Sequence, residues 1–365
     1  MQPPSSKFLE TADFIGAKLS REALWSGHRC NWYGVTVSQI QRATQLEAQS
    51  VCGSDFYSGT SGIALFLARL FAATGEKIFR TTAEGAIRQA LSRLDHFPPE
   101  CRTSFYTGLT GVAYSLFEIA ESCGIEKFND IGLLVMEEIA GDDTSVCDAA
   151  TVNALVRIHQ RHQRDFLLRF ATRCGDELLE RLRERSSSSL QKNRTSNASA
   201  MVELFKLTGE NKYREIAEQT LFDECGSREG LGADEIPSAR AHLRAFELLG
   251  QEIYSKCARE MIQSIELRID PPSDSDVNFT LAKGLTGKAD TVLEAGRVLV
   301  DEQLRGTAER VGNWGIEQYK ENDLPWPCGS TARWDSPSFM VGVAGIGYFY
   351  LRLYDSSQVP SVLFA

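Results

Sequence analysis

The chain has 365 residues, of which 42% are hydrophobic and 24% charged, a composition typical of a globular protein rather than a disordered one. Asp and Glu outnumber Lys and Arg by 49 to 39, and the net charge of −10 argues against nucleic acid or an anionic membrane as the main partner. No apolar run approaches the ~20 residues that a membrane span needs, and the first residues lack the pattern of a signal peptide. We therefore expect a cytoplasmic protein.

The cysteines fit a reducing compartment. There are nine of them, an odd number, and no two form a Cys-x-x-Cys pair. This argues against a disulfide framework and against a zinc ribbon. We expect most of the cysteines to be small buried hydrophobic residues.

Helical patterns run along almost the whole chain. In residues 63–71, apolar side chains recur at i, i+3, i+4, i+7 and i+8, which places them on one face of a helix. Gly75 is the predicted end of that helix. Similar apolar stretches follow Gly111, Gly287 and Gly345. Convincing strands are scarce and no βαβ alternation is present, so the sequence predicts an all-α fold.

A repeat accompanies these helices. Four of them follow a Gly-x-x-Gly motif, at residues 59–62, 108–111, 284–287 and 342–345. Glycine allows the start of a helix to approach a neighbouring segment closely. One such motif carries little information, but four with the same downstream pattern indicate a repeat.

Degenerate copies of the motif fill the long gap between the second and third. They start at residues 147, 193 and 232, so the seven starts are separated by 39 to 58 residues. This spacing fits two helices per unit. We predict an α/α toroid (a double α-barrel) of about seven helical hairpins, with the glycine motifs together at one end. A closed repeat is one domain, so we expect a single domain over residues 1–365. A scaffold without enzymatic activity is the alternative that this pattern leaves open.

Several segments resemble one protein family. They are HRCNWYGV (28–35), DFYSGTSGIALFLARL (55–70), FYTGLTGVAYSL (105–116), LAKGLTGKADTVLEAGRVL (281–299) and SPSFMVGVAGIGYFYLRLYDSSQVPSVL (336–363). In order and spacing, the chain resembles lanthionine synthetase C-like proteins, most closely the cyclase half of bifunctional lanthipeptide synthetases. The resemblance implies a double α-barrel that adds a peptide cysteine thiol to dehydroalanine or dehydrobutyrine and closes a thioether ring. The dehydratase half is absent, so the resemblance implies a dehydrated ribosomal precursor peptide as substrate and separate dehydrating enzymes, a kinase or a lyase, as partners.

The chain departs from the family at its metal site. Typical members hold zinc with the Cys of a Trp-Cys-x-Gly motif and with a Cys-His pair just before a later Gly-x-x-Gly. Zinc deprotonates a bound thiol, whereas a free cysteine with a pKa of about 8.5 is only a few per cent thiolate at neutral pH. At these positions the present chain has Glu229–Gly230 and Ala282–Lys283. We therefore predict no metal and no cofactor.

Three residues are the candidate catalytic groups. Lys283 replaces a metal ligand, where its charge could lower the pKa of a substrate thiol or stabilise an enolate; it could also act as a base, or simply reach water. Asp143 aligns with a catalytic Asp of the family, although it could instead be an exposed acid in the run GDD. Lys192 aligns with the position of a catalytic His. We predict Lys283, Asp143 and Lys192 as catalytic residues.

Three functions compete at this point. We favour a zinc-independent, thioether-forming peptide cyclase. The second hypothesis is a non-catalytic cyclase-like subunit that binds precursor peptide or activates a partner kinase, lyase or decarboxylase. The third is a protein that binds another thiol, such as glutathione. A zinc site rebuilt from Cys225, Cys328 and the five histidines is a further alternative that we do not favour.

Overall fold

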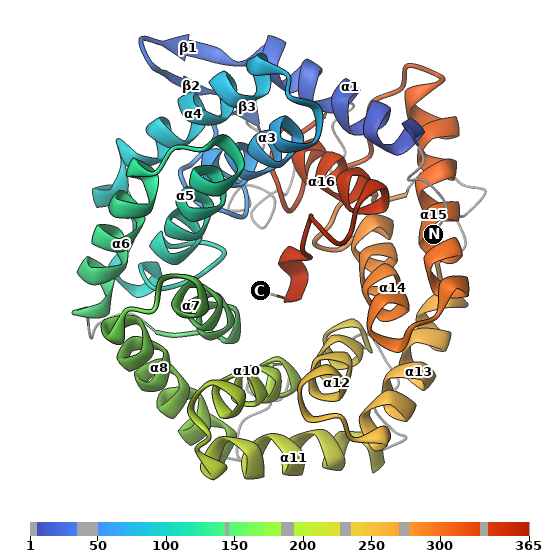
Figure 1. The fold of residues 1–365 in the computed structure, drawn as a ribbon. Coiled ribbons are helices and arrows are strands. Elements are labelled where there is room, and N and C mark those ends of the chain that lie inside the picture. The colour runs from blue at the N-terminus through green and yellow to red at the C-terminus, as the bar shows by residue number, and fades with distance from the viewer. Residues whose placement is uncertain are drawn as a thin grey trace, which may run out of the picture. The chain divides into compact units, whose positions relative to one another are not determined.

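The computed structural model describes residues 6–34, 50–142, 146–183, 193–226, 235–269, 277–328 and 335–364. Within these ranges helices dominate, as Figure 1 shows. The strands form two short antiparallel pairs near the N-terminus: β1 (Leu24–Ser26) with β2 (Arg29–Asn31), and β3 (Tyr33–Gly34) with β4 (Ser50–Val51). The prediction of an all-α fold is confirmed. No helix among the described residues has both the length and the apolar character that crossing a bilayer requires.

The helices follow one another in closely spaced pairs. They are α1 (Ser6–Glu22), α3 (Thr60–Thr74), α4 (Lys77–Leu91), α5 (Leu109–Cys123), α6 (Lys127–Ala140), α7 (Ala149–His162), α8 (Asp165–Arg183), α10 (Arg194–Thr208), α11 (Asn211–Gly226), α12 (Glu235–Leu249), α13 (Glu252–Glu266), α14 (Leu285–Leu299), α15 (Glu302–Gly315) and α16 (Val343–Tyr354). Helices α3, α5, α7, α10, α12, α14 and α16 each begin within three residues of a predicted repeat start. The repeat inferred from the sequence is therefore the repeat of the structure.

The last repeat takes its partner from the other end of the chain. Pairs such as α3 with α4, α7 with α8, α10 with α11 and α12 with α13 are consecutive in sequence. Helix α16 has no α-helix after it among the described residues and packs against α1 instead. The N-terminal helix therefore completes the seventh hairpin.

The chain divides into two compact units, each built from distant segments. Unit 1 comprises Met1–Met136, Pro271–Asp290 and Ala308–Ser361; unit 2 comprises Glu137–Asp270, Thr291–Thr307 and Val362–Ala365. Helices α14 and α15 contribute residues to both units. The single domain over residues 1–365 stays a prediction.

The two helices of a hairpin are buried to different extents. In unit 1, α16 buries 11 of its 12 residues and α5 buries nearly all of its length. Helix α4 buries a single face, with Phe79, Ala83, Ala86 and Ala90 toward the interior. In these examples the helix that follows a glycine motif is therefore buried on nearly every side, whereas α4 is amphipathic.

A charged residue recurs at one register of the repeat. The tenth residue of six of the motif-led helices, and the ninth of α7, is charged, and its sign alternates along the chain: Arg69, Glu118, Arg157, Glu203, Arg244, Glu294 and Arg352. Within unit 1, Arg69 pairs with Glu118, and within unit 2, Arg244 pairs with Glu203. Because both carboxylates are buried, these ion pairs join successive motif-led helices below the surface.

The expectation that the cysteines form no disulfides is contradicted. Cys147 is bonded to Cys174, and Cys225 is bonded to Cys257. The bonded residues are 27 and 32 positions apart in sequence, but the fold brings their Cα atoms to 5.4 and 6.2 Å. Sequence spacing alone carries no sign of this proximity.

Candidate functional site

The four glycine motifs of unit 1 are tied to one another by backbone hydrogen bonds. The N–H of Tyr57 donates to the carbonyl of Tyr106 (2.8 Å), and the N–H of Met340 donates to the carbonyl of Tyr57 (2.8 Å). The N–H of Ala282 in turn donates to the carbonyl of Met340 (2.9 Å). Each of these residues lies two positions before the first glycine of its motif. The four turns therefore form one continuous rim, which we call the glycine rim.

The second glycine of each motif is required by close approach. A Cβ atom on Gly111 would lie 2.0 Å from the carbonyl oxygen of Phe105, six residues earlier, and 2.6 Å from Cβ of Phe56. A Cβ atom on Gly287 would lie 2.0 Å from the carbonyl oxygen of Leu281, also six residues earlier. Because neither distance can accommodate a carbon atom, any larger residue would push the turn away from the start of its helix.

A buried aromatic layer supports the rim. Phe56, Phe105 and Phe339 each lie three positions before the first glycine of a motif and have no measurable exposure. The ring centroid of Phe56 is 4.8 Å from that of Phe105 and 5.0 Å from that of Phe339. These ring contacts hold the turns in place, so the residues immediately before the first glycines are attached to a rigid aromatic layer.

Lys283 is one of those projecting residues. The four positions directly before the first glycines hold Ser58, Thr107, Lys283 and Val341, so Lys283 carries the one charge among them. Its side chain is exposed, and it forms no ion pair with any residue in the described ranges. The ammonium group is therefore available at the rim to a bound molecule.

The carboxyl group of Asp55 lies at the rim and was not among the residues predicted from the sequence. Asp55 lies four residues before Gly59 and accepts a hydrogen bond from the backbone N–H of Ser58 (2.7 Å). Burial raises the pKa of Asp55 above its usual value, although the hydrogen bonds that it accepts act in the opposite direction. Its position inside the motif DFYSG was the available signal, but an Asp that caps a turn gives the same signal.

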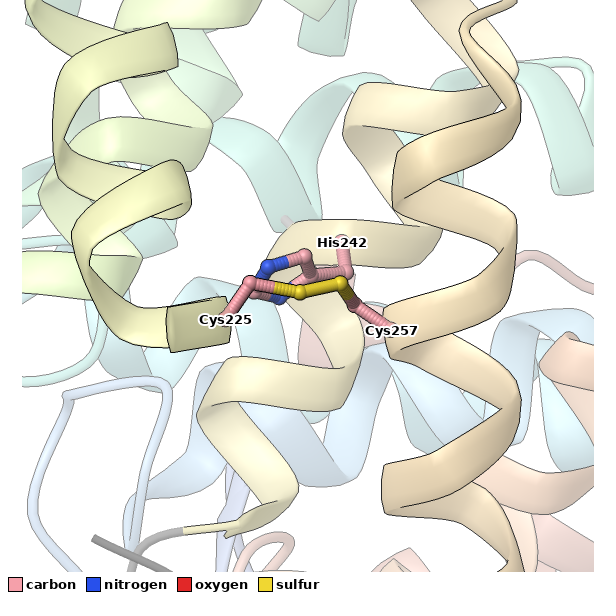
Figure 2. A group of neighbouring side chains, drawn as sticks. All are labelled: Cys225, His242 and Cys257. Atoms are coloured by element: carbon pink, nitrogen blue, oxygen red, sulfur yellow. A yellow bond between two sulfur atoms is a disulfide. The ribbon is translucent and has the colours of Figure 1, made fainter. Parts of the chain in front are cut away.

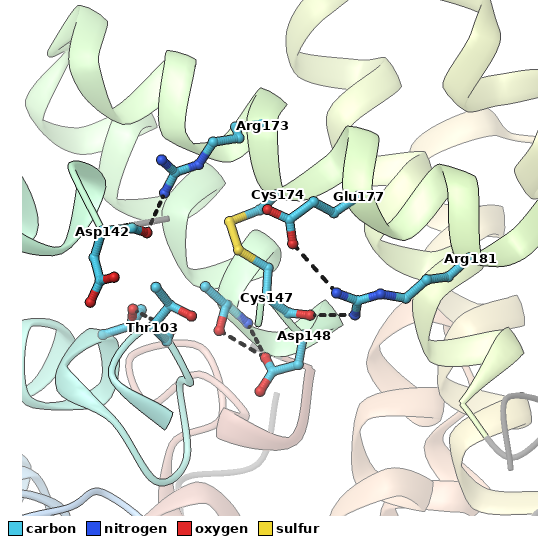
Figure 3. The surroundings of a disulfide bond; sticks show 10 residues. Thr103, Asp142, Cys147, Asp148, Arg173, Cys174, Glu177 and Arg181 are labelled. Carbon is cyan, nitrogen blue, oxygen red and sulfur yellow. Dashed lines mark hydrogen bonds and ion pairs between the residues drawn. A yellow bond between two sulfur atoms is a disulfide. The ribbon is translucent and has the colours of Figure 1, made fainter. Parts of the chain in front are cut away.

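The described residues on either side of Asp143 accept hydrogen bonds from α8. Asp143 itself falls in residues 143–145, outside the described part of the chain. On one side, the backbone carbonyl of Asp142 accepts a hydrogen bond from Arg173 (3.3 Å); on the other, the carbonyl of Cys147 accepts one from Arg181 (2.8 Å). Figure 3 shows both arginines on α8. Cys147 forms its disulfide with Cys174, which lies on the same helix.

Lys192 also lies outside the described residues, which resume at Asn193. Of the three predicted catalytic residues, the structure therefore locates Lys283 in unit 1. The catalytic roles of Lys283, Asp143 and Lys192 stay predictions.

The glycine rim does not fit the zinc ion of the family. Ala282 and Lys283 offer a methyl group and an ammonium group where the family has metal ligands, and neither can coordinate zinc. Residues 229–230, the remaining family position, lie outside the described ranges. Cys328 is buried, and burial raises the pKa of its thiol to about 12, which agrees with a structural role. A group that could hold a metal lies elsewhere, in unit 2, on Cys225, His242 and Cys257.

Comparisons with known proteins agree with this geometry. The family model described as lanthionine synthetase C-like protein matches residues 50–201 and 238–364. No curated protein matches the sequence of the chain.

Among solved structures, the chain is similar to nisin cyclase, with a TM-score of 0.62 and 12% identity over 97% of this chain and 96% of that one. This likeness shows the fold, an α/α toroid, as the sequence predicted. It is also similar to a sugar epimerase from a ruminal bacterium, with a TM-score of 0.49 and 12% identity over 96% and 98% of the two chains. A third similar structure is the GH76A α-1,6-mannanase of Salegentibacter sp. HEL1_6, with a TM-score of 0.46 and 9% identity over 81% of this chain and 99% of that one.

Proposed function

Since the chain belongs to the lanthionine synthetase C-like family, we propose that it is a zinc-independent peptide cyclase of the lanthipeptide type. It adds cysteine thiols of a ribosomally made precursor peptide to dehydroalanine or dehydrobutyrine and forms thioether rings. The observation that carries the proposal is the intact glycine rim with Lys283 at a metal-ligand position of the family.

The first step is formation of a thiolate, with the thiol proton released to solvent. One positive charge about 4 Å from a thiol stabilises the thiolate by ~1 kcal/mol in bulk water, which lowers its pKa by roughly 0.7. For a thiol with an ordinary pKa of about 8.5, this raises the thiolate fraction at neutral pH about fivefold. Because Lys283 is exposed, the bulk-water magnitude is the appropriate one.

The second step joins sulfur to carbon. The thiolate attacks the β-carbon of the dehydroamino acid, a C–S bond forms, and the alkene electron pair moves onto the carbonyl oxygen as an enolate. The ammonium group of Lys283 stabilises this negative charge. A proton delivered to the α-carbon then completes the addition, and no group leaves. Asp143 and Lys192 are the proposed sources of this proton.

The dehydrated substrate requires partner enzymes. A kinase that phosphorylates serine and threonine in the precursor and a lyase that eliminates the phosphate must act before this protein, and both would share its cytoplasmic location. The acidic net charge of −10 suits a peptide partner better than nucleic acid or a membrane.

The second candidate is a non-catalytic subunit. The motif copies that begin at residues 147, 193 and 232 lack the glycine pair of the other four, and the rim lacks metal ligands. Both observations fit a protein that binds the precursor peptide or activates a dehydrating or decarboxylating partner. Such a subunit would form a stable complex with that partner.

Co-expression distinguishes the two candidates. Precursor peptide and dehydrating enzymes are produced with and without this protein, and intact mass after thiol alkylation counts the cysteines that remain free. Loss of free thiols only in its presence supports the cyclase. Improved dehydration with free thiols unchanged supports the accessory subunit.

Variants then test the assignment of the site. We expect Lys283→Ala to slow ring closure about fivefold, from the charge effect above, and Lys283→Arg to retain most of the rate. Lys77→Ala is the matched control, because Lys77 is an exposed lysine that begins α4, and the 15 residues of α3 separate it from the rim by about 22 Å. If Lys283→Ala and Asp143→Ala both close rings at the wild-type rate, these residues are not the catalytic groups.

A further inference from the structure

Unit 2 holds a cluster of side chains of the kinds that bind metal ions, those of Cys225, His242 and Cys257 (Figure 2). The three residues come from α11, α12 and α13 in turn, and their two sulfur atoms and one histidine nitrogen all lie within 4.8 Å of one another. His242 and Cys257 are buried, and Cys225 is partly exposed. The two sulfurs are bonded to each other in this structure.

The hydrogen bonding of His242 assigns the tautomer of its neutral ring. Its Nδ1 lies 2.9 Å from the backbone carbonyl of Ser238, and a carbonyl can only accept, so Nδ1 carries the proton. The other nitrogen, Nε2, is then left with a lone pair. Nε2 has no hydrogen-bond partner among the described residues, and the side chain has no measurable exposure.

The buried lone pair of Nε2, which no donor in the described ranges contacts, needs an explanation. A buried polar atom without a partner costs about 1–3 kcal/mol, and native structures keep few of them. Metal-bound histidines show the same arrangement, with one ring N–H donated to a carbonyl and the other nitrogen bound to the ion. Nε2 of His242 is therefore prepared to bind a metal, and a nitrogen of the same ring lies within 4.8 Å of both sulfurs.

We propose that the reduced protein binds a zinc ion through Sγ of Cys225, Sγ of Cys257 and Nε2 of His242. Thiolate and imidazole ligands together favour Zn²⁺ over the harder Mg²⁺ and Ca²⁺. In a tetrahedral site with Zn–S of about 2.3 Å and Zn–N of about 2.1 Å, ligand atoms are roughly 3.5–3.8 Å apart. After reduction the two sulfurs must therefore move apart, and a histidine nitrogen already lies within 4.8 Å of both. On binding, the two thiols release two protons to solvent and nothing is oxidised or reduced.

The fourth ligand comes from solvent. A cavity of about 700 Å³ opens onto the cluster and is lined by all three residues together with Phe222 and Tyr254. Three protein ligands beside an open cavity leave one coordination position for water. The bound ion would join α11, α12 and α13 while remaining accessible to small ligands.

This site is separate from the family's zinc site and from the proposed cyclase function. The family ligands align with residues 229–230 and 282–283, none of which takes part here. The disulfide and the metal site use the same two sulfurs, so each state excludes the other. The metal site is therefore a property of the reduced protein.

Cobalt titration tests the proposal without any activity assay. The full-length protein is reduced with a phosphine under anaerobic conditions, freed of metal and titrated with Co²⁺ alone. We expect one equivalent to bind with the d–d bands of tetrahedral cobalt and a near-ultraviolet charge-transfer band from thiolate, and Zn²⁺ to displace it. Binding should weaken as the pH falls, because the thiols must lose their protons.

Three variants assign the ligands. Cys257→Ser and His242→Gln should each weaken cobalt binding by more than about 100-fold, beyond the ~10–100-fold lost when an outer partner of a ligand is removed. Cys123→Ser, which removes a buried cysteine of unit 1, should bind cobalt as the wild type does. His242→Gln is informative even if Cys257→Ser fails to fold, because it leaves the sulfur pair intact.

Two results overturn the proposal. One is a reduced wild-type protein that binds no cobalt, together with alkylation showing that Cys225 and Cys257 are bonded in the untreated protein; the pair is then a structural disulfide only. The other is cobalt binding that His242→Gln leaves unchanged.

Discussion

The buried ion pair between Arg352 and Asp290 connects α16 to α14, and its removal should be the most destabilising single change of charge in unit 1. Both side chains are 1% exposed. Asp290 also accepts a hydrogen bond from the hydroxyl of Ser361 (2.5 Å), and the guanidinium donates to the carbonyl of Val359 (3.1 Å). The pair thus holds Val359 and Ser361 against the helix whose preceding turn carries Lys283.

The perturbation is Asp290→Ala. Removing one partner of a buried pair leaves an uncompensated charge and costs about 3–5 kcal/mol. The hydroxyl of Ser361, which loses an acceptor, accounts for roughly 1 kcal/mol within that range. An exposed pair provides the control: Arg183 and Glu180 are 54% and 64% exposed, so Glu180→Ala should change the free energy of unfolding by less than about 0.5 kcal/mol.

The assay is equilibrium unfolding in urea, followed by circular dichroism and by tryptophan fluorescence so that noncoincident transitions reveal intermediates. The double variant Asp290→Ala, Arg352→Met should recover much of the loss, because an apolar side chain replaces the unpaired charge. A cost below about 1 kcal/mol for Asp290→Ala, or additive effects of the two substitutions, would refute the reasoning.

Two further predictions concern the glycine rim. Gly111→Ala should destabilise the protein by at least about 1–3 kcal/mol in urea unfolding, because its Cβ would lie 2.0 Å from the carbonyl oxygen of Phe105. Gly306→Ala in α15, where no atom lies within 4 Å of the added Cβ, should instead stabilise by about 0.5–1 kcal/mol, and equal effects of the two would contradict the close-approach argument. The raised pKa of Asp55 means that the folded state holds this proton more tightly than the unfolded state, so its contribution to stability is present below the ordinary pKa of 3.8 and is lost as the pH rises through the folded value. Asp55→Asn should therefore gain stability relative to wild type as the pH rises through that window, measured by urea midpoints; a difference independent of pH would count against it.

Features of the fold that depend on local sequence could be predicted. A Gly-x-x-Gly followed by an apolar run indicates a helix start directly, and even the degenerate copy at residue 147 gave the start of α7 to within two residues. Asp148 occupies the N-cap position of α7, where α3, α5 and α16 have the first glycine of their motifs. Its side chain accepts a hydrogen bond from the backbone N–H of Thr151 (2.7 Å), as a helix-capping residue does. The sequence signal is therefore a helix cap in general, of which the glycine pair is one form.

Features that depend on which helices are neighbours could not be predicted. The pairing of α1 with α16 joins opposite ends of the chain, and the alternating charges from Arg69 to Arg352 are visible only once the register of every repeat is known. The cluster of Cys225, His242 and Cys257 depends on three helices whose relative rotation no local pattern encodes. The position of Lys283 in the glycine rim could be predicted because it lies inside a motif; its catalytic role, like those of Asp143 and Lys192, stays a prediction.

The exchange of a zinc ligand for a lysine changes which effect should dominate the proposed catalysis. A zinc ion deprotonates a bound thiol outright, whereas an exposed ammonium group contributes only ~1 kcal/mol at about 4 Å. Holding the two reacting groups in the correct geometry can contribute about 7–11 kcal/mol. Addition of thiols to dehydroamino acids also proceeds without a catalyst. Positioning of the thiol and the alkene is therefore the larger contribution that this protein can make to the rate.

This comparison orders two substitutions that can be measured in one assay. Lys283→Ala removes a charge and leaves the glycine rim intact, so ring closure should slow only about fivefold. Gly111→Ala displaces the rim without touching a titratable group, and a misplacement of about 1 Å can cost ~100-fold. We therefore expect Gly111→Ala, assayed at a temperature where circular dichroism shows it folded, to close rings far more slowly than Lys283→Ala. The reverse order would mean that the charge of Lys283, rather than the geometry of the rim, carries the reaction.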